Sequence, residues 1–413
     1  MLLADTAIIG HLGTAELGGL AAASVVLGTV VGLCVFLAYG STASVARHHG
    51  AGDDRTAYGL AISSLWLASG LGVAFGVLVA ATSGVFGRAL SSSEAVAGFA
   101  DDYLVVSAIG VPAMLLILAA TGALRGVLDL RTPLYATIVA NIVNVVLNLT
   151  FVHALGWSVQ GAASGTVLAQ WLAAVWLVVV VVRRARPARA SLRPRVGRIL
   201  GAARDGVPLV IRTLTLRIAI VLAAIVAAGL GDVPLAAHQV AAAIVTFLAF
   251  ALDAIAIAGQ TLTGRSLGAG DAGRTRAMTR RMIGWGVGTG VLAGVLLALL
   301  APWLPHLFTN DPAVQKALVP ALLVVAAIQP LSGVVFVLDG VLIGAGDGVY
   351  LAIAGVLVLA VYTPLVLAVG WADGDFTWLW IAYGGFIATR LATLWLRQRG
   401  DAWMILGATR SAD

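Results

Sequence analysis

Polar side chains that could carry chemistry lie inside long apolar stretches of this sequence. The first is Asp5, which lies within the run from Leu2 to Ile9. If these stretches lie in a membrane, each charge within them costs about 3 kcal/mol or more unless it is paired or hydrated, which makes it a functional candidate. A carboxyl group there, partly removed from water, is suited to exchange protons near neutral pH. The alternative is that Asp5 merely lies near a frayed chain end.

Three asparagines, Asn141, Asn144 and Asn148, lie in a later apolar stretch. Their spacing places all three on one face of a helix. Amide oxygens arranged in this way can accept a hydrogen bond from a protonated carboxyl group or help to ligate a cation. Hydrogen bonding between helices is the alternative explanation. By the same reasoning, Thr166 and Gln170 share one face of the next apolar stretch.

Further polar residues stand at less certain positions. Tyr103 opens another apolar stretch, where a tyrosine of the membrane interface is an equally good explanation. In the second half of the chain, Arg212, Asp253 and Asp339 lie within apolar stretches. These charges form either a structural ion pair within that half or a second relay for protons or cations.

The composition explains where these residues lie. Of the 413 residues, 60% are hydrophobic and only 11% are charged. A soluble protein of this length needs far more charge to cover its surface. A membrane span takes roughly 20 apolar residues, so about eleven or twelve spans fit with short connections. The net charge of +6 does not indicate a nucleic-acid partner, because the arginines cluster in loops between spans.

The arginines gather in the loops that follow even-numbered spans, whereas the opposite loops carry mostly acids. The basic set includes Arg47, Arg125, Arg184, Arg265 and Arg397, and the acidic set includes Glu16, Glu94, Asp232 and Asp311. By the positive-inside rule, the basic loops and both termini are cytoplasmic. The sequence therefore predicts a multi-pass protein of the inner (plasma) membrane.

An internal repeat relates the two halves of the chain at an offset of 218 positions. Gly13 pairs with Gly231, and Asp129 pairs with Asp347. The run Gly50-Ala51-Gly52-Asp53 recurs as Gly268-Ala269-Gly270-Asp271, and Pro112 recurs as Pro330. Two parallel repeats with an even number of spans favour a transporter whose substrate path lies between the halves.

The repeat predicts an all-α polytopic fold, a twelve-helix bundle of two six-helix repeats. We expect a first lobe at residues 1–184, a basic cytoplasmic linker at 185–204, a second lobe at 205–400 and a cytoplasmic tail at 401–413. The first span would begin before Met1 if it matched its partner in the second half. We therefore expect the first helix to be truncated.

Motifs for enzymatic chemistry are absent from the sequence. There is no phosphate-binding loop, no nucleophilic serine motif and no zinc-binding helix motif. We therefore expect a secondary transporter rather than an enzyme, with no cofactor and no metal. An ion gradient would supply the driving force.

These residues resemble the multidrug and toxic compound extrusion (MATE) family, in particular its DinF-like branch. The resemblance is carried by four segments: Asp5 to Gly13, Leu124 to Asp129, Gly268 to Asp271 and Asp339 to Asp347. It implies a V-shaped bundle of twelve helices. It also implies export of amphipathic, often cationic compounds, driven by inward flow of protons or sodium ions.

The resemblance further implies that Asp5 is the main coupling carboxylate and that Asn144, Thr166 and Tyr103 match polar residues of the family. Asn148 stands where related members often carry an aspartate. Losing that acid removes a charge and weakens the case for a tight sodium site. A single carboxylate suits protonation, so we expect a proton gradient to drive transport, with sodium as the other possibility.

Two other functions remain open. A flippase for lipid-linked precursors would line its cavity with several basic residues, for which only Arg212, Arg217 and Arg390 are candidates. A membrane receptor or scaffold is disfavoured because the sequence contains no soluble or signalling domain. We expect the partners to be small amphipathic substrates and the lipid bilayer, and we expect the protein to be a monomer.

Overall fold

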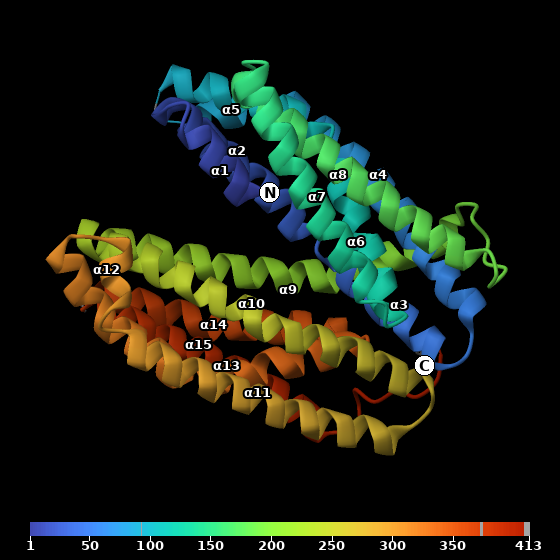
Figure 1. Ribbon diagram of the computed structural model, residues 1–413. Coiled ribbons are helices and arrows are strands. Elements are labelled where there is room, and N and C mark those ends of the chain that lie inside the picture. The colour runs from blue at the N-terminus through green and yellow to red at the C-terminus, as the bar shows by residue number, and fades with distance from the viewer. Residues whose placement is uncertain (92, 372–374, 409–413) are drawn as a thin grey trace. The chain divides into compact units, whose positions relative to one another are not determined.

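The structure is a computed structural model that describes residues 1–91, 93–371 and 375–408. Every regular element in these ranges is a helix, which confirms the expected all-α fold. The chain forms two compact units, Met1–Gly206 and Val207–Asp413 (Figure 1). Helix α9 (Val196–Gly229) begins within residues 185–204, which the sequence predicts as a linker, and the predicted division into lobes and linker stays a prediction. Of the predicted tail, residues 409–413 lie outside the described residues.

The first unit consists of helices that follow one another along the chain with short connections. They are α1 (Leu2–Gly10), α2 (Thr14–Leu33), α3 (Phe36–Gly50), α4 (Asp54–Ala89), α5 (Glu94–Ala108), α6 (Val111–Gly126), α7 (Arg131–Leu149), a π-helical turn at Thr150–Ala154 and α8 (Ser158–Ala185). Helix α1 packs against α2, α7 and α8. The short α1 therefore places its side chains among three longer helices.

The second unit continues from α9 with α10 (Asp232–Gly268), α11 (Ala272–Leu300), α12 (Leu304–Phe308), α13 (Pro312–Gly344), α14 (Gly348–Trp371) and α15 (Phe376–Arg399). Helix α13 packs against α10, α11, α14 and α15 and has more buried residues than any other helix of this unit. Glycines allow this close packing. A Cβ on Gly333 would collide with the backbone of Gly286 in α11, and a Cβ on Gly340 would collide with the backbone of Ala256 in α10.

Ten helices of the described residues are long and apolar enough to cross a membrane. The count becomes eleven if α5 and α6, which meet at a bend of 52°, form one span. Helix α1 has nine residues and is not among them. The bend lies just before Pro112, as the proline predicts, because proline has no backbone N–H to bond to the carbonyl four residues earlier and its ring disfavours a continuous helix there. Its repeat partner Pro330 lies inside the unbroken helix α13.

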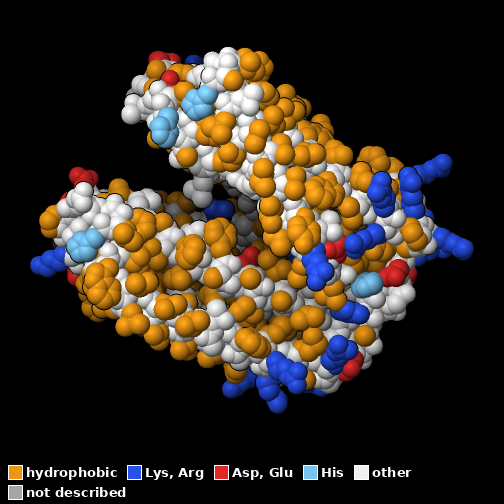
Figure 2. Space-filling view, viewed as in Figure 1, with side chains coloured by type: hydrophobic (Ala, Val, Ile, Leu, Met, Phe, Trp, Pro, Cys, Tyr) orange, Lys and Arg blue, Asp and Glu red, His pale blue; other side chains and the backbone are white. Residues whose placement is uncertain are grey.

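The flanks of the helices present apolar side chains to their surroundings (Figure 2). Phe247 is 74% exposed, Trp285 is 72% exposed and Leu307 is 79% exposed. A water-soluble surface does not carry large apolar side chains in such continuous bands. Together with the long apolar helices, this surface identifies a multi-pass membrane protein.

The basic loops gather at one end of each unit. In the first unit, Arg55 at the start of α4 lines a cavity with Arg195 and Arg198 from the segment that enters α9. In the second unit, Arg276 at the start of α11 forms an ion pair with Asp401 of the tail, at 2.9 Å. Loops that sequence analysis assigns to one side of the membrane thus contact one another within each unit.

The internal repeat is visible in the backbone of the loops. Gly52 and its repeat partner Gly270 adopt φ angles of +78° and +75°. The next residues, Asp53 and Asp271, cap the helices that follow, because their carboxylates accept hydrogen bonds from the backbone N–H three residues on. For Asp53, the hydrogen bonds from Thr56 hold the pKa below its usual value.

The left-handed turn at Gly346, between α13 and α14, leads to a stability prediction. Gly346 has φ +73° with open space beside it, so a side chain there meets only the strain of the left-handed conformation. Gly346→Ala should destabilise the protein by about 1 kcal/mol and lower its thermal unfolding temperature in detergent. The matched control is Gly28→Ala, because Gly28 lies inside α2 with open space and should gain stability. Equal behaviour of both variants would contradict the assigned strain.

Candidate functional site

The carboxylate of Asp5 is the centre of a buried polar cluster in the first unit. Only 1% of Asp5 is exposed. The hydroxyl of Tyr103 donates a hydrogen bond to Oδ2 at 2.9 Å, and Nδ2 of Asn148 donates to Oδ1 at 2.6 Å. The hydroxyl of Thr166 lies 3.1 and 3.0 Å from the two carboxylate oxygens. Nδ2 of Asn144 lies 3.4 Å from Oδ1 and donates to Thr166 at 2.8 Å.

Four helices position this cluster. Asp5 lies on α1, Tyr103 on α5, the two asparagines one turn apart on α7, and Thr166 on α8. Gly165 leaves the space that Asn148 occupies, since a Cβ at that position would collide with Asn148 Oδ1. The structure therefore brings together all five residues that the sequence predicted for ion coupling, and their role in coupling stays a prediction.

Two other polar residues of the same helix faces lie outside the cluster. Asn141 donates to the backbone oxygen of Thr137 at 2.8 Å and accepts a hydrogen bond from the amino group of Met1 at 2.6 Å. Gln170 is buried, but its Oε1 has no hydrogen-bond partner within the described part of the chain. The helical spacing alone could not separate these residues from those that contact Asp5.

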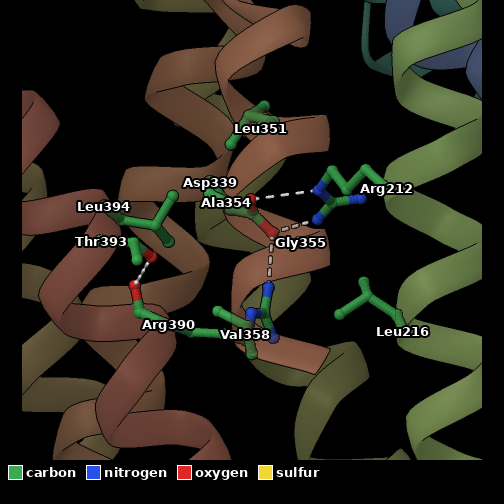
Figure 3. A pocket seen from close by; sticks show the side chains of 10 residues that line it. All are labelled: Arg212, Leu216, Asp339, Leu351, Ala354, Gly355, Val358, Arg390, Thr393 and Leu394. Atoms are coloured by element: carbon green, nitrogen blue, oxygen red, sulfur yellow. Dashed lines mark hydrogen bonds and ion pairs between the residues drawn. The ribbon is translucent and has the colours of Figure 1, made fainter. Parts of the chain in front are cut away.

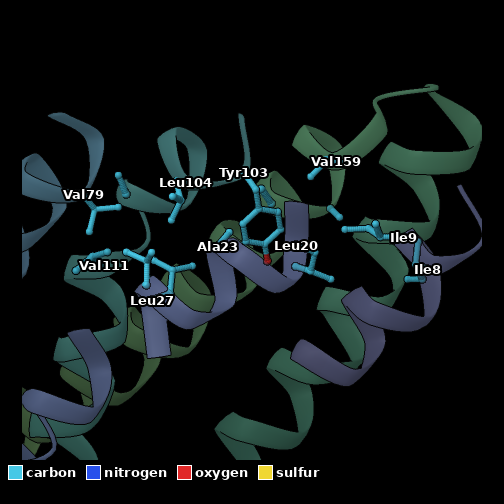
Figure 4. Packing of buried hydrophobic residues seen from close by; sticks show 14 of the residues in the cluster. Ile8, Ile9, Leu20, Ala23, Leu27, Val79, Tyr103, Leu104, Val111 and Val159 are labelled. Atoms are coloured by element: carbon cyan, nitrogen blue, oxygen red, sulfur yellow. The ribbon is translucent and has the colours of Figure 1, made fainter. Parts of the chain in front are cut away.

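Apolar side chains enclose the cluster. Ile8 and Ile9 of α1, Leu20 of α2 and Val159 of α8 are buried around it, together with the ring of Tyr103 (Figure 4). Such a shell excludes water, and hydrogen bonds in low-dielectric surroundings are stronger than those at a surface. The tyrosine is thus a core residue of the first unit.

The donors to Asp5 are all neutral groups. Among the described residues, Asp5 has no ion-pair partner within 4.0 Å, so hydrogen bonds alone stabilise its charge. Two amide oxygens beside it, Asn144 Oδ1 and Asn148 Oδ1, are buried and have no partner among the described residues. Rotation of an amide by half a turn exchanges its donor for its acceptor. The cluster can therefore serve an ionised carboxylate with N–H donors or a protonated one with an oxygen acceptor.

A second buried cluster lies in the second unit. Asp339 on α13 accepts a hydrogen bond from Arg212 Nε at 3.2 Å, a second one from Arg212 Nη2, and one from Arg390 Nη2 at 2.7 Å (Figure 3). The ion pair that sequence analysis considered is therefore present. In these contacts the partners of Asp339 are the two arginines, Arg212 and Arg390. The alternative role of Arg212, Asp253 and Asp339 as a relay remains a prediction.

Sequence analysis did not foresee that Arg390 joins this pair. The available signal was a lone arginine within the apolar stretch of α15, which in a membrane needs a partner. It also missed two ion pairs at corresponding loops, between Asp129 and Arg184 at 2.6 Å and between Asp347 and Arg397 at 2.7 Å. Burial acts to raise the pKa of Asp129, but the Thr132 hydrogen bonds and the Arg184 guanidinium outweigh it and hold that pKa below its usual value.

Comparison with known proteins adds independent findings. The MatE family model matches residues 1–150 and 208–367. Protein DETOXIFICATION 43 of Arabidopsis thaliana is 33% identical over 297 residues, which are 71% of this chain and 55% of that protein, so the match spans about half of that relative. DNA damage-inducible protein F of Escherichia coli K12 is 29% identical over 415 residues, covering 97% of this chain and 89% of that protein.

Solved structures share the fold. The crystal structure of the Vibrio cholerae MATE transporter VcmN in the bent form is similar with a TM-score of 0.87. The similarity covers 96% of this chain and 91% of that chain, at 20% sequence identity. The expected resemblance, with a two-unit helical transporter fold, is thus confirmed.

The hydroxyl of Thr166 links Asp5 to Asn144, which gives a test of the cluster. Thr166→Val should destabilise the purified protein by about 2 kcal/mol, because a buried carboxylate loses a donor and Asn144 loses its acceptor. Thr137→Val is the matched control, since the Thr137 hydroxyl donates to the backbone oxygen of Pro133 in its own helix, and this variant should change stability by no more than about 0.5 kcal/mol. Chemical denaturation in detergent measures both, and equal effects would argue against the cluster.

Proposed function

The chain belongs to the MatE family, and we propose that it is a secondary active transporter that exports amphipathic, often cationic drugs and toxic compounds. In this proposal the protein lies in the inner (plasma) membrane, with the basic ends of both units and both termini facing the cytoplasm. The inward flow of a cation, most simply a proton, drives export. The observation that carries the proposal is the Asp5 carboxylate, buried among neutral donors from four helices.

Protonation of Asp5 would change the hydrogen bonds that its neighbours in the first unit must make. When the carboxyl group is ionised, it organises Tyr103, Asn148 and Thr166 as donors, and hydrogen bonds to a charged group contribute about 1.5–3 kcal/mol each. When a proton neutralises it, one oxygen becomes a donor and the surrounding groups must rearrange. Since those groups belong to α5, α7 and α8, a single proton alters contacts among four helices.

Coupling requires that the two protonation states bind substrate with different affinities. We propose that the ionised state holds space for substrate in the first unit. A proton taken up from outside then favours an arrangement of α1 with lower substrate affinity, and the substrate leaves. Return of the proton to the cytoplasmic side restores the ionised state.

The number of carboxylates in the Asp5 cluster favours one coupling ion over the other. The oxygens of Asp5, Asn144, Asn148 and Thr166 are of the type that sodium ligates, so a sodium ion is chemically possible. The cluster offers only one carboxylate among the described residues, however, so it would provide little negative charge for a sodium ion. Proton exchange at Asp5 needs no further ligand, and we therefore propose proton coupling.

The lipid-linked precursor flippase remains the alternative. Of its three candidate basic residues, Arg212 and Arg390 line one cavity of the second unit and both contact Asp339. Arg217 is exposed on α9 and does not line that cavity. Two arginines that share one carboxylate give less support to a polyanionic lipid headgroup than the Asp5 cluster gives to a coupled antiporter.

Asp5→Asn tests the proposal in ethidium transport by proteoliposomes with imposed proton or sodium gradients. The variant should fold, because an amide can take part in the same hydrogen bonds, but it should lose gradient-driven transport because it cannot exchange a proton. Asp102→Asn is the matched control: it removes an exposed carboxylate on α5, the helix of Tyr103, and should transport normally. Full transport by folded Asp5→Asn would remove Asp5 from the mechanism.

Asn148→Asp tests the choice of ion. The new carboxylate would stand within hydrogen-bond distance of Asp5, and two adjacent carboxylates cannot both remain ionised without a proton or a cation between them. We expect this variant to gain transport driven by a sodium gradient alone. Asn141→Asp is the control on the same helix, because Asn141 contacts Thr137 and not Asp5, and it should show no such gain. A sodium-driven wild type would contradict the choice of the proton.

A further inference from the structure

Three arginines of the first unit line one polar cavity. Arg55 stands at the start of α4, Arg195 lies just before α9 and Arg198 lies in the first turn of α9. The cavity measures about 240 Å³, and Thr56 and Ser191 complete its lining. A water molecule needs about 15 Å³ of such space, so the cavity has room for a larger polar ligand.

The positive charge of this cavity is not paired within it. Among the described residues, none of the three arginines forms an ion pair within 4.0 Å. The two acids at the start of α4 do not line the cavity and have other partners. Asp53 accepts a hydrogen bond from the backbone of Thr56, and Asp54 contacts His49 at 2.6 Å. The cavity therefore attracts an anion.

Two features of α4 bring the segment before α9 to this place. Nε1 of Trp66 donates a hydrogen bond to the backbone oxygen of Leu192 at 3.1 Å, which holds that segment against α4. Gly59 leaves room for the half-buried Arg198, because a Cβ at position 59 would collide with Nη1 of that arginine. The arginines thus gather through packing between segments that are distant in the sequence.

A second cavity, of about 160 Å³, adjoins the first, because Arg198 lines both. Its walls are largely apolar and include Phe36 of α3 and Leu60 and Leu67 of α4. The two leucines lie about one and three turns beyond Arg55 along α4. The apolar cavity therefore extends from the basic loops toward the apolar part of the helices.

One acid lines the apolar cavity. Asp205 is exposed and follows Arg198 by seven residues along α9, which is about 10 Å. A carboxylate repels a phosphate group, so the anionic part of a ligand is drawn to the arginines and away from Asp205. The pair of cavities thus has a basic end and an apolar end.

We propose that these two cavities bind an anionic glycerophospholipid, with its phosphate among the three arginines and one acyl chain in the apolar cavity. Arginine binds phosphate oxygens through charge-assisted hydrogen bonds that are often bidentate. The hydroxyls of Thr56 and Ser191 suit a headgroup that carries hydroxyls, such as glycerol. Basic pockets at the ends of membrane-spanning helices are suited to such headgroups. A free phosphate would leave the apolar cavity unused.

This site is separate from the Asp5 cluster and goes beyond the proposed function. All its residues lie in the first unit, and Asp5 lines neither cavity. Binding of a lipid needs no ion gradient and no proton exchange at Asp5. A binding measurement on the purified protein therefore succeeds or fails independently of the transport assays.

Two variants separate the headgroup from the acyl chain. Arg198→Gln removes the charge that both cavities share, and its matched control is Arg193→Gln, an exposed arginine of the same segment that lines neither cavity. Gly40→Leu keeps every charge and fills the apolar cavity, because Gly40 lines it and has open space beside its Cα. Gly28→Leu is the control, since Gly28 of α2 has equal space and lines neither cavity.

Scintillation proximity binding of radiolabelled phosphatidylglycerol to the immobilised full chain, in an uncharged detergent, tests the proposal. Phosphatidylcholine and inorganic phosphate are the competitors. We expect saturable binding that neither competitor displaces at the concentration at which unlabelled phosphatidylglycerol does. Binding should be at least about fivefold weaker in folded Arg198→Gln and Gly40→Leu and unchanged in the two controls.

Three outcomes would overturn the assignment. Equal binding by all four variants would remove the site. Displacement by phosphatidylcholine as effective as by phosphatidylglycerol would show that the anionic headgroup is not recognised. Displacement by inorganic phosphate at the same concentration as the lipid would assign the arginines to a free phosphate.

Discussion

Burial of one carboxylate sets the constraints on the first unit. Asp5 can lie at 1% exposure only if neighbouring helices replace the water that it loses. Three of them do so, with a hydroxyl from α5, amides from α7 and a hydroxyl from α8. Each donor must also lie on the inward face of its helix. The spacing of Asn144 and Asn148, the glycine at position 165 and the packing of α1 among longer helices all follow from that requirement.

The two units stabilise their buried carboxylates in different ways. In the first, neutral donors surround Asp5, so gain or loss of a proton changes hydrogen bonds without breaking an ion pair. In the second, Asp339 on α13 is held between the guanidinium groups of Arg212 on α9 and Arg390 on α15. The first arrangement suits exchange of a small cation, and the second joins α9, α13 and α15 through charge pairs.

Much of this arrangement could be predicted from the sequence because it depends on local patterns. The apolar stretches, the repeat at 218 positions and the three-and-four spacing of the asparagines indicated the helices and the face that meets Asp5. Contacts between segments that are distant in the sequence were harder to predict. Asp339 could have paired with any arginine of its half, and only the packing of α9, α13 and α15 selects Arg212 and Arg390. The break at Pro112 and the continuity at Pro330 likewise depend on surroundings that the repeat does not encode.

Proton release on substrate binding tests the central claim most directly. Isothermal titration of purified protein with ethidium, in buffers that differ in ionisation enthalpy, counts the protons exchanged per substrate bound. If binding favours the ionised state of Asp5, near-neutral titrations of the wild type should release up to about one proton, and Asp5→Asn should release none. Substrate binding without proton release, or the same release from Asp5→Asn, would contradict the account in which this carboxyl group couples the ion to the substrate.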